Sequence, residues 1–351
     1  MKRGLSTCST KSRQAGSVLT RPSLRALTPL LLACAAVVAG CASTPKPALH
    51  AIGDLPLPGK PTRFEGQSFD AANNRLYIAH TGDGELIMVD TSAKRVIANI
   101  PNFPGCTGVC AVPELGSVAV GVPGRDEVVI MNTGSLKSTR AAGGEAPYSI
   151  AWASDIGKLY LTDLRGPSAT VVDLRMNNRV TSIDLGGGIG AVQYDPQTRR
   201  ILMNVRTTNE LAEIDPATDL VASRLKLSGG KTPHGLEIAP AARVAFVGCV
   251  DDAKLLVIDL EKWKVREEFV TAEGPDMLAF DEGLGMLYVG TESNNVSVFR
   301  LKGKDLDRLG DVEVGPNAHS VCVNSTTHEV YVPLENVNGK PTLRILAPAM
   351  Q

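Results

Sequence analysis

The sequence has 351 residues, with 36 basic and 37 acidic side chains and a formal net charge of −1 at pH 7. Residues 1–40 hold six basic and no acidic residues, so residues 41–351 carry 30 basic against 37 acidic ones, a formal charge of −7. A net negative charge on residues 41–351 argues against the basic surface that nonspecific nucleic-acid binding requires, so we expect no nucleic-acid partner.

The first 40 residues have the features of a signal peptide, because basic residues precede the apolar run ALTPLLLACAAVVAG, which is too short to span a bilayer comfortably. The run leads into VVAGC, which resembles the bacterial lipoprotein box. The resemblance implies lipidation of Cys41, a membrane anchor of several acyl chains, and residues 41–48 as a lipidated tether. Ala42 resembles lipoproteins of the outer membrane, so we expect a periplasm-facing location there; the alternative is an ordinary secreted protein.

Four further cysteines follow the proposed lipidation site: Cys106, Cys110, Cys249 and Cys322. An exported protein can form disulfides, but a C-x₃-C pair such as Cys106 and Cys110 closes only across a turn. We therefore expect buried or partly buried thiols. The chain has no C-x₂-C pair after Cys41, which argues against a zinc ribbon.

Short alternating apolar runs with Gly, Asp and Asn turns between them recur along the mature chain, and helical periodicity is nearly absent. Equivalent apolar residues in the second strand of each repeat are Leu76, Val118, Leu159, Ile201, Ala245, Leu287 and Val330. Their spacings of 42, 41, 42, 44, 42 and 43 residues match the length of a four-stranded propeller blade. The sequence therefore predicts an all-β, seven-bladed β-propeller over residues 49–347, with a C-terminal tail at 348–351.

The last repeat has no fourth strand, because the chain stops after TLRILAPAMQ. The segment IGDLPLPG at 52–59 parallels LGDVEVGP at 309–316, which is the fourth strand of the sixth repeat. We therefore predict that the N-terminal strand completes the last blade and closes the ring, which leaves no exposed sheet edge and favours a monomer. Pro56 and Pro58 suit an outermost strand, where a missing N–H is tolerated.

The strand pairs LYVGTESNNVSVF and AFVGCVDDAKLLVID resemble those of the YVTN-type seven-bladed β-propeller family. The resemblance covers nearly all of residues 49–347. It implies the fold, but not a function, because propellers have many unrelated activities.

The residue that precedes the alternating run of each first strand is often polar. In chain order these residues are Glu65, Gly108, Tyr148, Gly190, His234, Asp276 and His319. The innermost strand of every blade starts at one rim of the central channel, so we expect these residues to surround the mouth of that channel. Second strands end at the same rim, which adds His80 and Asp163, and the loops behind them add Arg165 and Arg206.

Glu65, His234, Asp276 and His319 lie on consecutive blades, and two imidazoles with two carboxylates could ligate a divalent metal such as zinc or manganese. The alternative is structural: each histidine caps the start of its blade by bonding a backbone carbonyl of its neighbour. A third interpretation adds Arg165 and Arg206 to hold a polar or anionic small molecule, because guanidinium groups suit carboxylate or phosphate.

We favour a binding module, for a small molecule or an envelope protein, over an enzyme. One resemblance supports an enzyme instead. The segment FEGQSFDAANNRLYIAHT is similar to the start of gluconolactonase-type propellers, which have six blades and whose leading glutamate is a metal ligand. This resemblance implies a metal-dependent hydrolase with Glu65 among its metal ligands.

Overall fold

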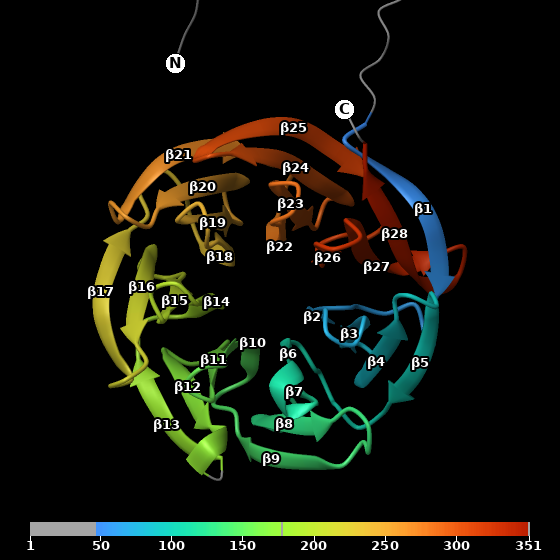
Figure 1. The fold of residues 1–351 in the computed structure, drawn as a ribbon, viewed down its shortest axis with the longest axis horizontal. Helices are drawn as coiled ribbons and strands as arrows, with labels where there is room; N and C mark the ends of the chain where they lie inside the picture. Colours follow the sequence, from blue (N-terminus) through green and yellow to red (C-terminus); the bar gives the residue numbers. More distant parts are fainter. Residues whose placement is uncertain (1–46, 177, 350–351) are drawn as a thin grey trace, which may run out of the picture. The chain divides into compact units, whose positions relative to one another are not determined.

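The computed structural model describes residues 47–176 and 178–349, which form seven four-stranded antiparallel sheets around a common axis (Figure 1). The predicted all-β, seven-bladed propeller is therefore confirmed. The predicted signal peptide at 1–40 and the predicted lipidation site at Cys41 lie outside the described residues. So do residues 42–46 of the tether and residues 350–351 of the tail.

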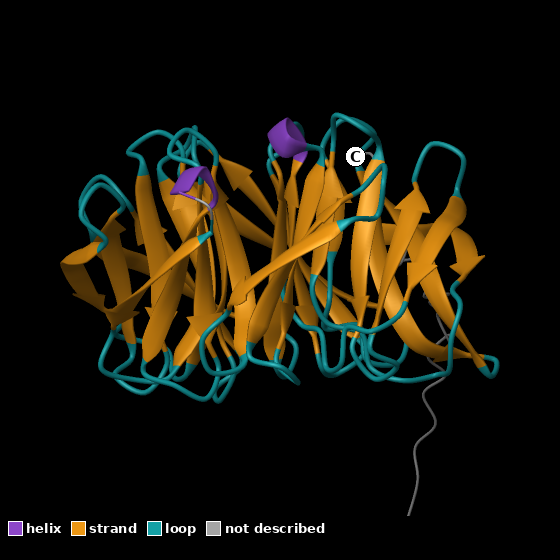
Figure 2. Ribbon diagram, turned by 90° about the horizontal axis from the view of Figure 1, so that it is seen from below, coloured by secondary structure: helices purple, strands orange, loops and turns teal. Residues whose placement is uncertain are grey.

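Each blade contributes one strand to each of four concentric positions, and Figure 2 shows these strands running between two edges that carry the loops. The innermost strands are β2 (Gln67–Asp70), β6 (Val109–Val112), β10 (Pro147–Ala153), β14 (Ile189–Asp195), β18 (Pro233–Ala239), β22 (Pro275–Asp281) and β26 (Cys322–Asn324). The second strands are β3 (Arg75–His80), β7 (Ser117–Val122), β11 (Lys158–Asp163), β15 (Arg200–Val205), β19 (Val244–Cys249), β23 (Met286–Thr291) and β27 (Glu329–Val337).

The third strands are β4 (Glu85–Asp90), β8 (Glu127–Asn132), β12 (Ser168–Asp173), β16 (Glu210–Asp215), β20 (Lys254–Asp259), β24 (Asn295–Lys302) and β28 (Lys340–Pro348). The outermost strands are β5 (Arg95–Ile100), β9 (Ser138–Ala142), β13 (Arg179–Asp184), β17 (Leu220–Lys226), β21 (Lys264–Val270), β25 (Asp305–Glu313) and β1 (Leu49–Pro56). Two short 3₁₀ helices, η1 (Pro113–Leu115) and η2 (Leu174–Met176), complete the described elements. None of the described residues forms a helix with the length and apolar character needed to cross a bilayer.

The hydrophobic core lies between neighbouring blades. Second strands such as β23 are buried along their whole length, because the sheets on either side cover both of their faces. Tyr160 of the third blade, for example, packs in one cluster with Ile201 and Met203 of the fourth blade, and all three are fully buried. Because apolar burial is satisfied between the blades, the space along the axis remains a channel that polar groups can line.

Aspartates at the ends of the third strands fix the turns to the outermost strands, as the repeat pattern predicts. Asp215 accepts the backbone N–H of Ala217, and Asp259 accepts those of Glu261 and Lys262. Such bonds make the Asx turns that position tight hairpins. These aspartates therefore have a structural role.

The four cysteines of the propeller are free thiols, as expected from the sequence. Cys106 and Cys249 are buried, and Cys110 and Cys322 are half-buried. Burial raises the pKa of each thiol to about 12, so all four remain protonated at neutral pH. The fold is therefore held by strand pairing and packing, and by no disulfide among the described residues.

The ring is closed by pairing between the two ends of the described chain, as predicted. The seventh sheet has the order β1-β28-β27-β26, and β1 lies beside β28 at its outer edge (Figure 1). The antiparallel register runs from Leu49 opposite Pro348 to Pro56 opposite Thr342. Arg344 joins the same two strands through two hydrogen bonds of 2.8 and 2.6 Å to the Asp54 carboxylate.

Glycines let the innermost strands approach one another near the axis. A Cβ on Gly235 would lie 1.9 Å from the backbone oxygen of Asp276, and one on Gly108 would lie 2.2 Å from that of Tyr148. No side chain fits either space. These contacts place Asp276 and Tyr148 directly against the neighbouring blade.

We expect the substitution Leu49→Ala to weaken ring closure, because Leu49 is only 1% exposed and packs in the cluster between the sixth and seventh blades. The expected loss is about 2–5 kcal/mol of unfolding free energy, measured by urea denaturation. Ile52→Ala on the same strand is the matched control, because Ile52 is 43% exposed, and it should cost about 0.5 kcal/mol. Equal losses in the two variants would contradict the closure that the structure shows.

Candidate functional site

Five ionisable side chains predicted at the rim come together around the start of the channel: Glu65, Tyr148, His234, Asp276 and His319. We call these five residues the channel mouth. They come from five different blades, and each is at most 9% exposed. Five of the residues that precede the alternating run of an inner strand therefore lie close together, as the repeat alignment predicts.

Backbone irregularities direct three of these side chains toward the axis. In β10, β18 and β22, the pairing with the second strand shifts register at the start of the inner strand. Two residues of the inner strand then oppose one residue of its partner, which is a β-bulge. Tyr148, His234 and Asp276 are each the first residue of such a pair. The bulge thus moves each side chain out of the strict two-residue alternation of its strand.

Tyr148, His234 and Asp276 form one hydrogen-bonded group. His234 Nε2 lies 3.0 Å from Asp276 Oδ1 and 2.8 Å from the Tyr148 hydroxyl. Burial opposes the ionisation of Asp276, but the charges of His234, His319 and Arg63 outweigh it and lower the pKa of Asp276. Burial raises the pKa of Tyr148 well above its ordinary value, so its hydroxyl keeps its proton. Asp276 is therefore charged at neutral pH, and Tyr148 is neutral.

The second part of the mouth joins His319 to Glu65. His319 Nδ1 lies 2.9 Å from the side-chain oxygen of Asn317 and 3.1 Å from its backbone oxygen. Both partners are acceptors, so Nδ1 carries a proton and donates it. His319 Nε2 then faces Glu65 Oε2 at 3.8 Å, and neither atom has a hydrogen-bond partner among the described residues.

Two acceptor atoms that face each other in a buried site require a positive group between them or on one of them. Burial opposes the charged imidazole, but Glu65 and Asp276 outweigh it and raise the pKa of His319. A metal ion satisfies the same two atoms, since one ligand atom each from Glu65, Asp276 and His319 lies within 4.8 Å of the others. Two metal bonds of about 2.0–2.2 Å can span the 3.8 Å between Nε2 and Oε2.

Arg63, which the sequence analysis did not single out, lies beside these carboxylates. Its Nε donates to Glu65 Oε1 at 2.5 Å, and its Nη2 lies 2.8 Å from Glu292 Oε1 and 3.9 Å from Asp276 Oδ2. Burial opposes its charge, but Glu292 and Glu65 raise the pKa of Arg63 further above its ordinary value. Arg63 lies two residues before Glu65 and therefore outside the positions that repeat from blade to blade, so no repeat pattern could have found it.

Three predicted rim residues are held by contacts away from the channel mouth. His80 stacks on Phe64 with ring centroids 4.3 Å apart, and its Nε2 lies 3.0 Å from the Thr62 hydroxyl. Asp163 accepts the hydroxyl of Ser168 at 2.7 Å, within its own blade. Arg165 is an exposed residue that pairs with Asp126 of the neighbouring blade at 2.6 Å.

Arg206, the remaining predicted rim residue, follows β15. It lies close enough to the mouth for its charge to oppose the rise in the pKa of Tyr148. A second possible metal-ligand set, His80 with Asp83 and Glu85, lies in the first blade. Its Asp83 carboxylate already accepts the Lys60 backbone N–H at 2.7 Å and the Thr62 hydroxyl at 3.1 Å. The residues of this first-blade set are therefore better explained by contacts that hold the fold, whereas the mouth residues are better explained by a ligand.

A cavity of about 410 Å³ begins at the mouth and follows the inner strands along the channel. Tyr148, His234 and Asp276 line one end, and Asn324 with Thr326 line the other. This volume lies within the range of about 300–1,000 Å³ that small-molecule pockets occupy. The mouth is thus continuous with enough space for a small ligand.

No protein-family model and no curated protein matches the sequence. Among solved structures 1748 chains match, and one of them is a chain of hydrazine synthase from Kuenenia stuttgartiensis. Its TM-score is 0.72 at 15% sequence identity, over 84% of this chain and 97% of that chain. At this identity the likeness shows the propeller fold alone, a fold that suits a binding or interaction module but does not specify one.

Replacement of Arg63 by methionine should destabilise the mouth, because Glu65 and Asp276 would then face each other without the guanidinium charge. Since the Arg63 side chain is 40% exposed, we expect a loss of only about 1–2 kcal/mol of unfolding free energy in urea denaturation. Lys302→Met, which removes an exposed pair with Asp307 at 3.1 Å within the sixth blade, should cost less than about 1 kcal/mol. An unchanged Arg63→Met variant would show that the mouth does not depend on that charge.

Proposed function

We propose that this chain is a binding protein of the bacterial cell envelope and that its ligand occupies the channel mouth. The observation that carries the proposal is the pair of buried, unpartnered acceptors His319 Nε2 and Glu65 Oε2, which face each other at 3.8 Å. Buried polar atoms in folded proteins nearly always have partners, and exceptions are typical of functional sites. A bound group that supplies the missing positive charge accounts for the arrangement.

The first component of the ligand is a divalent cation, held by Glu65, Asp276 and His319. The Nδ1–H of His319 bonds to Asn317, as the second nitrogen of a metal-bound histidine usually does to a neighbouring acceptor. His234 is the partner that orients Asp276, at 3.0 Å, and supplies no ligand atom to this set. One imidazole and two carboxylates suit zinc or manganese.

A metal-dependent hydrolase is the second candidate function. The same three residues favour it, because a cation with three protein ligands keeps a position open for water or substrate. If the protein hydrolyses lactone or phosphoester test substrates only when Mn²⁺ is added, that result would support this candidate. If it binds the cation but hydrolyses none of these substrates, the result would favour the binding function.

The envelope location rests on the lipoprotein box at Cys41 and the signal peptide before it. We also assign the chain to the YVTN-type propeller family, on the repeated strand pairs that were matched above. Under this proposal the propeller faces the periplasm from the outer membrane, as a monomer. Its physiological partner is a small molecule or an envelope protein that reaches the mouth.

Calorimetric titration of chelator-treated protein with Zn²⁺ and with Mn²⁺ tests the cation site. We expect one bound ion per chain, and His319→Gln should weaken binding by more than the roughly 10–100-fold that loss of an orienting partner costs. His234→Gln should fall within that 10–100-fold range, because His234 only orients Asp276.

The matched control for these variants is His328→Gln. His328 pairs with Asp281 at 2.8 Å, at the end of the inner strands away from the mouth, so the same change there should leave cation binding intact. Binding that survives in His319→Gln, or that disappears in His328→Gln, would contradict the assigned ligands. Protein that binds neither ion would exclude a cation at the mouth.

The membrane anchor is tested by Cys41→Ser, which removes the sulfur that carries the lipid. Radiolabelled palmitate should be incorporated into the wild-type chain and not into the variant. The wild-type chain should remain in the membrane pellet after a high-salt wash, because several acyl chains bind far more firmly than one. A variant that still sediments with the membranes would contradict lipid anchoring through Cys41.

A further inference from the structure

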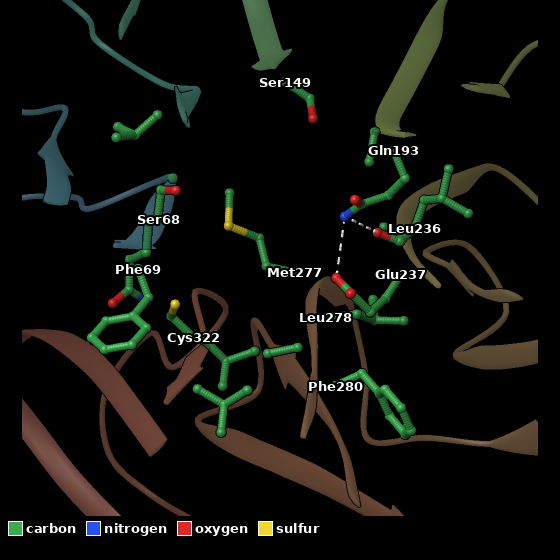
Figure 3. Close-up of a pocket in the computed structure, with 18 of the residues that line it drawn as sticks. Ser68, Phe69, Ser149, Gln193, Leu236, Glu237, Met277, Leu278, Phe280 and Cys322 are labelled. Atoms are coloured by element: carbon green, nitrogen blue, oxygen red, sulfur yellow. Dashed lines mark hydrogen bonds between the residues drawn. The ribbon is translucent and has the colours of Figure 1, made fainter. Parts of the chain in front are cut away.

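A second polar site lies inside the channel, beyond the mouth, where the inner strands present mostly small residues. Three residues past each mouth position, four blades carry Ser68, Ala111, Ala151 and Ala279. The fourth, fifth and seventh blades instead carry Gln193, Glu237 and Cys322. All three of these larger side chains line the cavity (Figure 3).

The Glu237 carboxyl group could accept a positively charged ligand. Its Oε2 accepts a hydrogen bond of 3.1 Å from Gln193 Nε2, which also donates to the Leu236 backbone oxygen at 3.1 Å (Figure 3). The backbone N–H of Ile238 also acts on this carboxyl group, but no arginine, lysine or histidine among the described residues forms an ion pair with it. The carboxyl group therefore has no cationic partner of its own.

The rest of the cavity wall favours a positively charged guest. Its lining contains no lysine and no arginine among the described residues, whereas Asp276 and Glu237 supply carboxyl groups at two depths. Ser68 and Ser149 add hydroxyl oxygens, and Met277 extends into the space between them (Figure 3). A channel lined by acidic groups with low-dielectric walls concentrates cations.

We propose that the channel interior binds a small organic cation, a primary ammonium group on a short apolar chain, and that the ammonium pairs with Glu237. Gln193 holds the carboxyl group in place. The apolar part of the ligand lies against Leu236, Leu278 and Phe280, which line the same cavity. This site is separate from the cation site at the mouth and uses none of its three ligands.

An ammonium group fits this position better than a metal ion does. Glu237 belongs to no set of three metal-ligating side chains among the described residues. The nearby sulfur ligand, Cys322, remains a thiol because burial raises its pKa to about 12, and soft metals bind the thiolate. A single carboxyl group with an amide partner matches the three donors and one charge of an ammonium group.

Binding should be coupled to proton release. Burial raises the pKa of Glu237 to about 8, and the backbone N–H of Ile238 opposes this only in part. At pH 7 the empty site is therefore mostly protonated, and an ammonium group must displace that proton. Affinity should rise about tenfold from pH 7 to pH 9.

The other groups that face the cavity do not reverse this dependence on pH. Burial raises the pKa values of Tyr148 and Cys322, so both are neutral over this range. The lowered pKa of Asp276 keeps that carboxylate charged throughout. His234 is bonded to Asp276, and Gln193 does not titrate.

Calorimetric titration with n-butylammonium, n-butanol and butyrate tests the proposal, because these probes share a chain and differ in charge. Only butylammonium should bind, at one site per chain, with about one proton released at pH 7. An alkylamine has a pKa close to that of lysine, near 10.4, so the probe remains charged at pH 9. Glu237→Gln should weaken binding at least about tenfold and abolish the pH dependence.

Glu313→Gln is the matched control, since Glu313 is an exposed residue of the outermost strand β25, and it should bind like the wild type. Glu237→Gln has the shape of the protonated acid, and its thermal unfolding should confirm that it folds. Butyrate binding as tight as butylammonium binding, or an unaffected Glu237→Gln variant, would overturn the proposal. His319→Gln should bind butylammonium normally, so failure of the mouth site and failure of this site are distinguishable.

Discussion

The pairing of β1 with β28 is the interaction on which the rest of the molecule depends. It gives the seventh blade its fourth strand and brings the first and last strands of the described chain into one sheet. The functional consequence lies at the axis, because Glu65 is on the first blade and His319 is on the seventh. The Ser320 hydroxyl, beside His319, donates to the Glu65 backbone oxygen across this closure, although 255 residues separate them in sequence. An open ring would separate the two facing acceptors.

Closure also explains how charges can crowd at the mouth. Burial of Glu65 and Asp276 costs free energy that local contacts do not fully recover, since Glu65 Oε2 has no partner among the described residues. The cores between the blades provide the stability that offsets this cost, and the glycine contacts near Gly235 fix the distance between neighbouring mouth residues. The polar axis is therefore possible because the apolar cores between the blades are fully buried. The same reasoning applies to Glu237 deeper in the channel.

The sequence predicted the architecture because a repeat of about 42 residues and alternating apolar positions are set by blade packing. It also located the mouth, because the start of every inner strand meets the same rim. The sequence could not distinguish residues that face the axis from residues whose polar atoms are bonded within their own blade. His80 and Asp163 lie at the same rim but bond within the first and third blades. Arg63 was missed because it lies outside the repeat frame. Glu237 was missed because it lies three residues past the mouth residue His234, at a position where most blades carry a small residue.

Cation binding at the mouth depends on the direction of the His319 ring, which its bonds to Asn317 determine and which no sequence pattern shows. Anomalous X-ray diffraction from crystals of the propeller soaked in Mn²⁺ tests that account most directly. We expect one strong anomalous peak per chain, bordered by Glu65, Asp276 and His319, inside a closed ring of seven blades. A closed ring without a peak at that position, with His319 Nε2 hydrogen-bonded directly to Glu65, would contradict the central claim.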